Sequence, residues 1–523
     1  MLAMYQGNEV NMALRKTYSS SLALLLKGVC KVPSALDTHV SGLAIDSREV
    51  KKGDIFLAIS GNHSTSTEHI KEAIAKGANA IVAEGSTNKG KVFEDGLVVE
   101  LFVDNLKEQI GLIADRFFRS PSSEMSVIGV TGTNGKTSVT HYLASYFSRA
   151  SDLAGVIGTL GYGLVGGDND QLKETGFTTP NVVEVHRYLA ELRDAGAKNI
   201  FMEVSSHGLS QHRVDGVKFE GAVFTNLTHE HLDYHGTMEE YAASKAKLFS
   251  KESLKFVVIN EDDNYARQFI AATPSGVNIF TYGVQSKSDI SVLNYQLNTD
   301  SVSTITAEIT TPAGEFNIHS SLIGLFNLSN LLAVMSVAVA KQELRSCEQR
   351  MQAITPVNGR MQIVHIKDKP IVVVDFAHTP DALENAIDAV KPHCKGKVIL
   401  VFGCGGDRDI GKRKVMAQIA ERLADSIIVT DDNPRSEQPD VITEHIFEGF
   451  KNKEAVKLEH DRQAAIQLAV SQASAQDLVL IAGKGHETWQ EIKDKKYYFN
   501  DLEVVRKVLG LDVSQEGSRE AIA

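Results

Sequence analysis

Residues 129–138 read GVTGTNGKTS, and they lie between an apolar run that predicts a strand and a segment that predicts a helix. Gly132 and Gly135 allow backbone amides to approach a phosphate group closely. Lys136 can reach the outer phosphates of a nucleotide, and Thr137 can hold Mg²⁺. The usual pattern has glycine at the second position of this stretch, where this chain has valine. A chance Gly-Lys-Thr is common, but the strand–loop–helix context favours phosphate binding over a structural turn.

Two further strand ends carry acidic and imidazole groups, in the stretches MEVSSHGLSQHR (202–213) and TNLTHEHLDYHG (225–236). Glu203 and His231 can ligate a divalent cation held by nucleotide phosphates, because carboxylate and imidazole both suit such a metal. The chain has 17 histidines, so several must be ordinary core or surface residues. We interpret His229 and His235 as such ordinary residues without a role in metal binding.

Four apolar runs in the last third of the chain end in polar residues beside glycine. The runs span 371–376, 397–403, 426–431 and 478–483, and their alternation with helical patterns predicts a parallel, doubly wound sheet. Ligands bind beyond the carboxyl ends of such strands. The residues that follow are AHTPD, CGGDRD, DNPR and KGHE. One polar strand end would be unremarkable, but four that carry Arg, Asp, His and Glu predict a second site at this edge.

The stretch TDDNPRSE (430–437) places an arginine just past a buried strand. Arg435 can bind an anion through the parallel N–H donors of its guanidinium group. Arg408 follows another of the four strands and can assist. The competing interpretation is that Arg435 pairs with a neighbouring acid such as Glu437.

The composition limits the classes of partner. The chain has 523 residues, with 54 Lys and Arg against 66 Asp and Glu, which gives a net charge of −12. This acidity argues against nucleic acid or an anionic membrane as the main partner. The four cysteines lack zinc-type spacing, and the apolar run at residues 22–26 is too short for a signal-peptide core or a membrane span. We expect a cytoplasmic, monomeric protein that acts on small molecules.

The elements that position these residues fall into three predicted domains, because the chain is too long for one core. Residues 1–121 predict a small N-terminal α/β domain with a helix at 68–78. Residues 122–356 predict a central P-loop ATPase-like domain with a mostly parallel sheet, a helix at 182–196 and a β-rich insert at 286–320. Residues 357–523 predict a Rossmann-like C-terminal domain. The predicted fold class is therefore α/β with three domains.

Together these stretches resemble the Mur ligases, the ATP-dependent amide-forming enzymes of peptidoglycan synthesis. The resemblance runs from about residue 40 to 510 and includes DSREVKKGDIFLAISG, GVTGTNGKTS, EVSSHGL, HLDYHG, GLFNLSN, NGRM, DFAHTPDAL and GKGHE. The phosphate loop with valine is this family's form of the loop. TDDNPRSE together with GCGGDRD is similar to the member that adds meso-2,6-diaminopimelate, with the L-lysine-adding sister ligase as the alternative.

The resemblance implies ATP and Mg²⁺ as cofactors and assigns residues to each ligand. The implied ATP-binding residues are Gly132, Thr133, Asn134, Gly135, Lys136, Thr137, Ser138, Asn327, Arg360 and Asp375. The residues implied for the UDP-muramoyl dipeptide are Ile45, Ser47, Asn62, His63, Ser64, Thr178, Thr179, Ser205, Gln211 and Arg213. The implied metal site comprises Thr137, Glu203, His231 and Lys245, with Lys245 carbamylated. The residues implied in catalysis are Lys136, Lys245, Glu203 and His231.

Diaminopimelate is lysine with a second amino-acid head, which carries one ammonium and one carboxylate. The resemblance places this distal head at the C-terminal sheet. Arg408 and Arg435 can hold the carboxylate through paired N–H donors. The remaining implied contacts are Asp432 and Asn433 for the ammonium, Pro434 as a restraint on the loop, and Gly483 and Glu487.

Overall fold

The computed structural model describes residues 17–59, 66–85, 91–92, 98–150, 152–166, 172–298, 304–493, 495–511 and 521–522. The chain forms two compact units that interleave along the sequence. The first comprises residues 1–131, 147–222 and 243–255, and the second comprises residues 132–146, 223–242 and 256–523.

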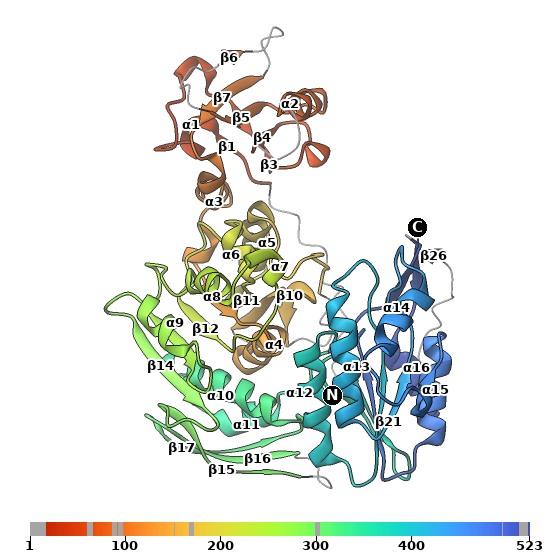
Figure 1. Ribbon diagram of the computed structural model, residues 1–523. Helices are drawn as coiled ribbons and strands as arrows, with labels where there is room; N and C mark the ends of the chain where they lie inside the picture. The colour runs from red at the N-terminus through yellow and green to blue at the C-terminus, as the bar shows by residue number, and fades with distance from the viewer. Residues whose placement is uncertain are drawn as a thin grey trace, which may run out of the picture. The chain divides into compact units, whose positions relative to one another are not determined.

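The first unit contains a five-stranded sheet built from short apolar strands. β3 (Gly42–Ala44), β4 (Asp54–Ala58), β5 (Ala80–Glu84) and β7 (Val99–Val103) pair in parallel, and β6 (Lys91–Val92) is antiparallel to β7. All five residues of β4 are buried, as expected for a parallel strand that is covered on both faces. The covering helices are α2 (Ser66–Ala75) and α3 (Leu106–Phe117) (Figure 1).

The same unit holds the strands that carry the predicted dipeptide site. β8 (Ser126–Thr131), β11 (Ala197–Glu203) and β9 (Leu153–Gly158) are parallel, and β10 (Gly161–Val165) forms a hairpin with β9. The predicted helix at 182–196 is α5 (Val182–Asp194), which starts at an Asn181 cap whose side chain accepts the Glu184 N–H. α6 (Ser206–Ser210) directly follows the β11 end, so polar residues at that end are held on a short, capped helix.

The second unit contains the predicted β-rich insert. It forms β15 (Ile290–Leu297), β16 (Ile305–Thr311) and β17 (Gly314–Ser320), an antiparallel meander beside the parallel pair β13 (Phe256–Asn260) and β14 (Asn278–Gly283). α10 (Leu325–Ala340) is largely apolar and mostly buried, because it packs against β13, β14 and β15.

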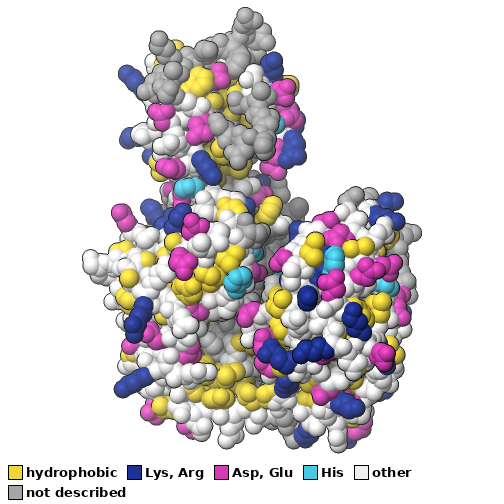
Figure 2. Space-filling model, viewed as in Figure 1, with side chains coloured by type: hydrophobic (Ala, Val, Ile, Leu, Met, Phe, Trp, Pro, Cys, Tyr) yellow, Lys and Arg dark blue, Asp and Glu magenta, His cyan; other side chains and the backbone are white. Residues whose placement is uncertain are grey.

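The surface carries both signs of charge. On the face shown in Figure 2, Lys and Arg side chains are interspersed with Asp and Glu side chains. Among the described helices, none combines the length and the apolar character that a bilayer crossing requires.

The C-terminal sheet has the order β18-β19-β23-β20-β21-β22. β19 (Ile371–Asp375), β23 (Leu478–Ala482), β20 (Val398–Phe402) and β21 (Ser426–Val429) run parallel and adjacent, so the prediction that four apolar runs share one sheet is confirmed. The edge strands are β18 (Gln362–Val364), which is antiparallel, and β22 (Val456–Leu458). The carboxyl ends of the four central strands therefore meet at one edge.

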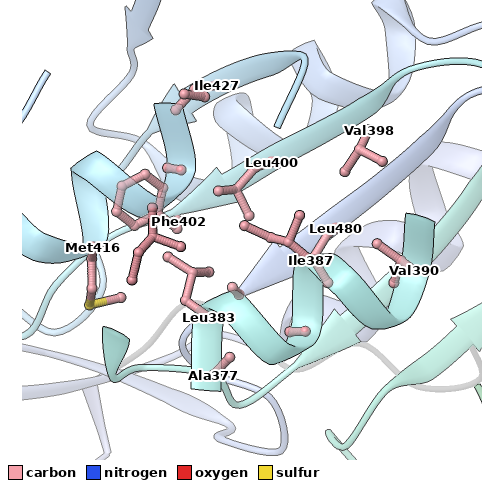
Figure 3. Close-up of a cluster of buried hydrophobic side chains, with 14 of the residues drawn as sticks. Ala377, Leu383, Ile387, Val390, Val398, Leu400, Phe402, Met416, Ile427 and Leu480 are labelled. Atoms are coloured by element: carbon pink, nitrogen blue, oxygen red, sulfur yellow. The ribbon is translucent and has the colours of Figure 1, made fainter. Parts of the chain in front are cut away.

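Helices cover both faces of this sheet, as the doubly wound prediction requires. α12 (Pro380–Val390), α13 (Gly411–Leu423) and α14 (Pro439–Phe447) cover one face, and α15 (Arg462–Gln472) and α16 (Asp501–Leu509) cover the other. Leu383 and Ile387 of α12 point toward Leu400 and Phe402 of β20 in the first core (Figure 3). Apolar packing on both faces fixes the strands, and the loops at their ends carry the polar residues.

Candidate active site

The phosphate loop is a tight turn between β8 and α4 (Lys136–Phe147). Gly135 has a φ of +84°, in the left-handed region that favours glycine, and a Cβ on Gly132 would collide with the hydroxyl of Thr225. The Lys136 ammonium donates to the carbonyl of Gly132 at 2.9 Å and to that of Thr133 at 2.7 Å. The lysine therefore lies over the loop. The next two residues, Thr137 and Ser138, are buried in the first turn of α4.

Residues from two other segments of the second unit brace this loop. The Asn226 carbonyl accepts the Thr133 N–H at 2.8 Å, and its side-chain oxygen accepts the Asn134 N–H at 2.8 Å. One carboxylate oxygen of Asp381 accepts from the Asn134 side chain at 2.9 Å and from the Thr228 hydroxyl at 3.0 Å. Burial raises the pKa of Asp381, and these two hydrogen bonds oppose the shift. No contact with the phosphate loop was predicted for Asn226, Thr228 or Asp381, although Asp381 stands in the strand-end stretch AHTPD.

Asn327 is buried on α10 and engaged at both ends of its side chain. Its oxygen accepts from the Tyr142 hydroxyl at 3.2 Å and from the Asn330 amide at 3.1 Å, while its amide donates to the Ile323 carbonyl at 2.8 Å. The side chain therefore links α10 to α4, the helix that begins at the phosphate loop. Its contact with ATP stays a prediction.

Arg360 and Asp375 lie together beside the end of β19. The Arg360 guanidinium stacks over the ring of Phe376, 4.5 Å from its centroid. The Asp375 carboxylate accepts the backbone N–H groups of Met361 and Ala377 at 2.8 and 2.9 Å. Burial raises the pKa of Asp375, and the charge of Arg360 opposes that shift.

Glu203 is held rigidly at the end of β11 in the first unit, where it is only 1% exposed. One carboxylate oxygen accepts the Thr159 N–H at 2.8 Å, and the other lies 3.2 Å from the Thr159 hydroxyl. That hydroxyl lies 3.0 Å from the Thr178 hydroxyl. A Cβ on Gly158 would collide with the carboxylate, so glycine at that position makes room for Glu203.

Four further residues predicted to bind the dipeptide, Thr179, Ser205, Gln211 and Arg213, join the same network. The Thr179 hydroxyl donates to the Glu203 carbonyl at 3.0 Å and accepts the Ser205 N–H at 2.9 Å. Arg213 donates to the Thr179 carbonyl at 2.7 Å and to the side-chain oxygen of Gln211 at 2.6 and 3.0 Å. The structure therefore brings these predicted residues of the first unit together.

Lys245 lies on α8 (Met238–Ala246) and is 1% exposed. Its neighbour Ser244 donates to the Ser206 carbonyl at 3.0 Å, which ties α8 to α6. A fully buried lysine is rare and costly unless its surroundings compensate its charge. Lys245 was assigned through the family resemblance alone, because a solvated lysine is the default expectation on a helix.

The four predicted metal ligands are divided between the units. Glu203 and Lys245 belong to the first unit, and Thr137 and His231 belong to the second. The His231 side chain is 43% exposed and lies 3.7 Å from Glu230. Within the described part of the chain, no three His, Cys, Asp or Glu side chains form a group that could hold a metal ion.

Ser47 is buried in the N-terminal part of the first unit. Its hydroxyl donates to Glu72 at 2.6 Å and lies 3.2 Å from the His69 ring nitrogen, while Lys76 donates to its carbonyl at 3.2 Å. Ile45 packs against the local apolar core. The other predicted contacts for the UDP group, Asn62, His63 and Ser64, lie outside the described residues.

At the C-terminal sheet edge, Arg435 and Arg408 flank Gly405. A Cβ on Gly405 would lie 2.8 Å from the Arg435 guanidinium and 3.7 Å from Cγ of Arg408, so glycine leaves space for both side chains. Arg435 donates to the Gly406 carbonyl at 2.8 Å, and its Nε lies 3.3 Å from a carboxylate oxygen of Glu491. Arg408 is exposed.

The competing interpretation, that Arg435 pairs with a nearby acid, is confirmed with a different partner, because the acid beside Arg435 is Glu491 and not Glu437. Glu437 forms two hydrogen bonds with the buried Arg413 guanidinium, at 2.8 and 2.9 Å, and it also accepts the Asp407 N–H at 2.6 Å. Asp407 in turn accepts from the hydroxyl and N–H of Ser436. These contacts join the two loops that carry Arg408 and Arg435.

A closed polar triangle lies beside the two arginines. The buried Lys484 ammonium donates to the Asn433 oxygen at 3.0 Å and to Glu487 Oε2 at 2.8 Å, and the Asn433 amide donates to the same Glu487 oxygen at 2.8 Å. The buried Asp432 carboxylate lies next to Gly483, where a Cβ would come within 2.6 Å of it. Pro434 is buried between these residues and Arg435. Lys484 stands in the predicted strand-end stretch KGHE, but no individual role was predicted for it.

The chain is similar to known proteins in all three of its predicted domains. Three family models match: the Mur ligase family catalytic domain over residues 39–117, the Mur ligase middle domain over 130–338, and the Mur ligase glutamate ligase domain over 359–485. A relative from Xylella fastidiosa, named UDP-N-acetylmuramoyl-L-alanyl-D-glutamate–2,6-diaminopimelate ligase, is 44% identical over 96% of this chain and 99% of its own. This chain belongs to the Mur ligase family.

Solved structures agree with this membership and confirm the predicted α/β fold class. A structure with the same name as the Xylella relative matches 90% of this Mur ligase and 95% of its own chain, with 34% identity and a TM-score of 0.65. A folylpolyglutamate synthase from Mycobacterium tuberculosis, solved with ADP and AMPPCP, shares the fold at 18% identity and a TM-score of 0.60, and it covers 77% of this chain and 95% of its own.

Proposed function

We propose that this Mur ligase joins meso-2,6-diaminopimelate to the D-glutamate side-chain carboxylate of UDP-N-acetylmuramoyl-L-alanyl-D-glutamate. ATP is converted to ADP and phosphate in the reaction, which belongs to peptidoglycan synthesis. The name of the 44% identical Xylella relative supports this substrate pair. We further propose that the enzyme acts as a monomer in the cytoplasm, without a nucleic acid or membrane partner.

The arrangement of charges at the C-terminal sheet edge is the observation that supports diaminopimelate as the amino-acid substrate. The distal head of diaminopimelate has a carboxylate and an ammonium. Arg435 and Arg408 flank Gly405 and supply donors for the carboxylate, while Asp432, with Asn433, supplies acceptors for the ammonium and Glu487 adds a further carboxylate. Only Oε2 of Glu487 is used by Lys484 and Asn433, so Oε1 is available to a ligand.

The chemistry requires activation of a carboxylate that is otherwise unreactive toward amines. The γ-phosphoryl group of ATP passes to an oxygen of the D-glutamate side chain, which gives an acyl phosphate and ADP. The amine of diaminopimelate then attacks the acyl carbon, and the tetrahedral intermediate loses phosphate and a proton to give the amide. Lys136 and the amides of the phosphate loop neutralise and position the transferred group.

The residues predicted for Mg²⁺ fit a hard cation. The buried Glu203 carboxylate has a fixed orientation through Thr159, and the Thr137 hydroxyl lies in the first turn of α4 beside the loop amides. Carbamylation of Lys245 would add a second anionic oxygen ligand beside Glu203 and would replace a buried ammonium by a group that binds the cation. When bound, Mg²⁺ would neutralise charge on the phosphates.

The L-lysine-adding sister ligase is the second candidate function. Lysine ends in an ammonium alone, so Arg435 would keep no carboxylate partner from the substrate. A site built around a polar group can reject an analogue that lacks the group by roughly 10⁴-fold. The two arginines beside Gly405 therefore favour diaminopimelate over lysine.

A phosphate-release assay tests the reaction class. ATP, Mg²⁺, the UDP-muramoyl dipeptide and diaminopimelate are supplied together, and each is then omitted in turn. We expect release only when all four are present, with an amide product of the two substrates. Phosphate release that continues without an amino acid would contradict the ligase proposal and favour a nucleotide-hydrolysing regulator.

A further inference from the structure

Arg435 adopts a backbone conformation that needs external support. Its φ is +53°, a region that side-chain-bearing residues rarely occupy. Two hydrogen bonds to the segment at β24 (Trp489–Ile492) hold it there: the Arg435 N–H donates to the Glu491 carbonyl at 3.0 Å, and the Arg435 carbonyl accepts the Lys493 N–H at 2.8 Å. The position of this arginine therefore depends on a segment more than 50 residues away in sequence.

The side chain of Glu491 adds a third restraint, on the guanidinium itself. Its carboxylate lies 3.3 Å from Nε of Arg435, and the two side chains are 25% and 18% exposed. On the opposite side, the Gly406 carbonyl accepts from Nη1 at 2.8 Å. An arginine has five N–H donors, so these two contacts orient the group and leave donors for a ligand carboxylate.

Glu491 also restrains the acceptor side of the same subsite. Its backbone N–H donates to the Asn433 side-chain oxygen at 2.9 Å, the oxygen that also accepts from Lys484. Glu491 therefore contacts both Arg435, which is assigned to the distal carboxylate, and Asn433, which is assigned with Asp432 to the ammonium.

We propose that Glu491 is a positioning residue for the distal amino-acid head, which it serves by holding the Arg435 guanidinium in the orientation that binds the carboxylate. A free arginine side chain loses rotamer entropy when it binds, and fixing it before the substrate arrives removes part of that loss from binding. This inference rests on the proposed function, because it takes diaminopimelate as the ligand.

The alternative role for Glu491 is competition with the substrate for Arg435. The two roles predict changes of opposite sign in the KM for diaminopimelate when the Glu491 carboxylate is removed. If the Glu491 carboxylate competed with the substrate carboxylate for Arg435, its removal would lower the KM for diaminopimelate. If it positions Arg435, its removal raises that KM. The backbone contacts to Asn433 and Arg435 persist in a side-chain variant, so the side-chain effect can be measured by itself.

The test measures steady-state kinetics of Glu491→Ala and Glu491→Gln. We expect the KM for diaminopimelate to rise about three- to tenfold in Glu491→Ala, in line with a partly exposed ion pair, while the KM for ATP and kcat stay within twofold. Glu491→Gln should recover part of the loss, because its amide oxygen keeps a partial negative charge near Nε of Arg435. Glu503→Gln is the matched control, since Glu503 accepts from Tyr498 at 2.5 Å and does not contact Arg435.

A double-mutant cycle makes the assignment specific to Arg435. In an Arg435→Ala background, Glu491→Ala should change the KM for diaminopimelate by less than twofold, because the group that it positions is gone. A wild-type enzyme without diaminopimelate-dependent turnover would overturn the proposed function. Normal wild-type turnover with an unchanged or lowered KM in Glu491→Ala would overturn only the role of Glu491.

Discussion

Replacement of Arg435 by alanine removes a guanidinium that is 18% exposed and fixed on two sides. The variant loses the donor that we assign to the distal carboxylate of diaminopimelate. It also leaves the Gly406 carbonyl and the Glu491 carboxylate without their arginine partner. The ATP-binding loop is built from other residues, so we expect the substitution to act on the amino acid alone.

The expected loss of binding free energy follows from the burial of the ion pair between Arg435 and the distal carboxylate of diaminopimelate. Truncation of one partner of a buried, hydrogen-bonded charge pair costs about 2–5 kcal/mol. Because the Arg435 side chain retains some exposure, solvent screening places the expected loss in the lower half of that range, at about 2–3 kcal/mol. At about 1.4 kcal/mol for each factor of ten, the KM for diaminopimelate should rise roughly 30- to 150-fold.

The assay compares KM values for diaminopimelate, ATP and the UDP-muramoyl dipeptide in wild type and Arg435→Ala. Arg422→Ala is the control, because Arg422 pairs with Glu384 at 2.7 Å on the exposed side of the same sheet domain. We expect the control to match wild type, and we expect kcat/KM for lysine to be nearly unchanged in Arg435→Ala. Equal KM values for diaminopimelate in wild type and Arg435→Ala would refute the assignment.

Three further predictions concern other parts of the molecule. Lys245→Ala should be nearly inactive and partly rescued by short-chain carboxylates, whereas an active enzyme whose Lys245 is unmodified by mass spectrometry would contradict carbamylation. Asp501→Asn should lower the free energy of unfolding by about 3–5 kcal/mol in a denaturant titration, because it breaks a fully buried pair with Arg462 at 2.7 and 2.8 Å; an unchanged midpoint would count against this. Burial lowers the pKa of His460, but its hydrogen bond to Asp431 at 2.8 Å and the nearby negative charge outweigh this, so the net pKa is raised. A histidine with a raised pKa in the folded state stabilises the fold below about pH 6.5, and this stabilisation is lost as the pH rises through the pKa of the folded state. His460→Gln should therefore be less stable than wild type at about pH 6 and equally stable at about pH 9.

The sequence was sufficient to predict the elements and the strand ends. The apolar runs at 371–376 and 478–483 are buried parallel neighbours, and the β-rich insert and the helix after residue 181 appear where their patterns predict them. These features follow from local periodicity and from the rule that parallel strands share one carboxyl edge. The same logic identified the loops that carry Arg408 and Arg435.

The partners of those residues could not be predicted in the same way. Arg435 has Glu437 two residues away, yet its carboxylate partner is Glu491, and Glu437 pairs with Arg413. Proximity in sequence favoured the wrong acid, because the left-handed backbone at Arg435 and the pairing with β24 arise only in the folded chain. Lys484 lies in the predicted strand-end stretch KGHE, but its burial and its contacts with Asn433 and Glu487 arise only in the folded chain.

The central claim is that the C-terminal sheet edge selects an amino acid with a distal carboxylate. The most direct test offers meso-diaminopimelate and L-lysine together, at equal concentration, to the enzyme with ATP, Mg²⁺ and the UDP-muramoyl dipeptide, and measures the ratio of the two products by mass spectrometry. We predict a product that contains diaminopimelate almost exclusively. A product mixture rich in lysine would contradict the account and assign the chain to the sister activity.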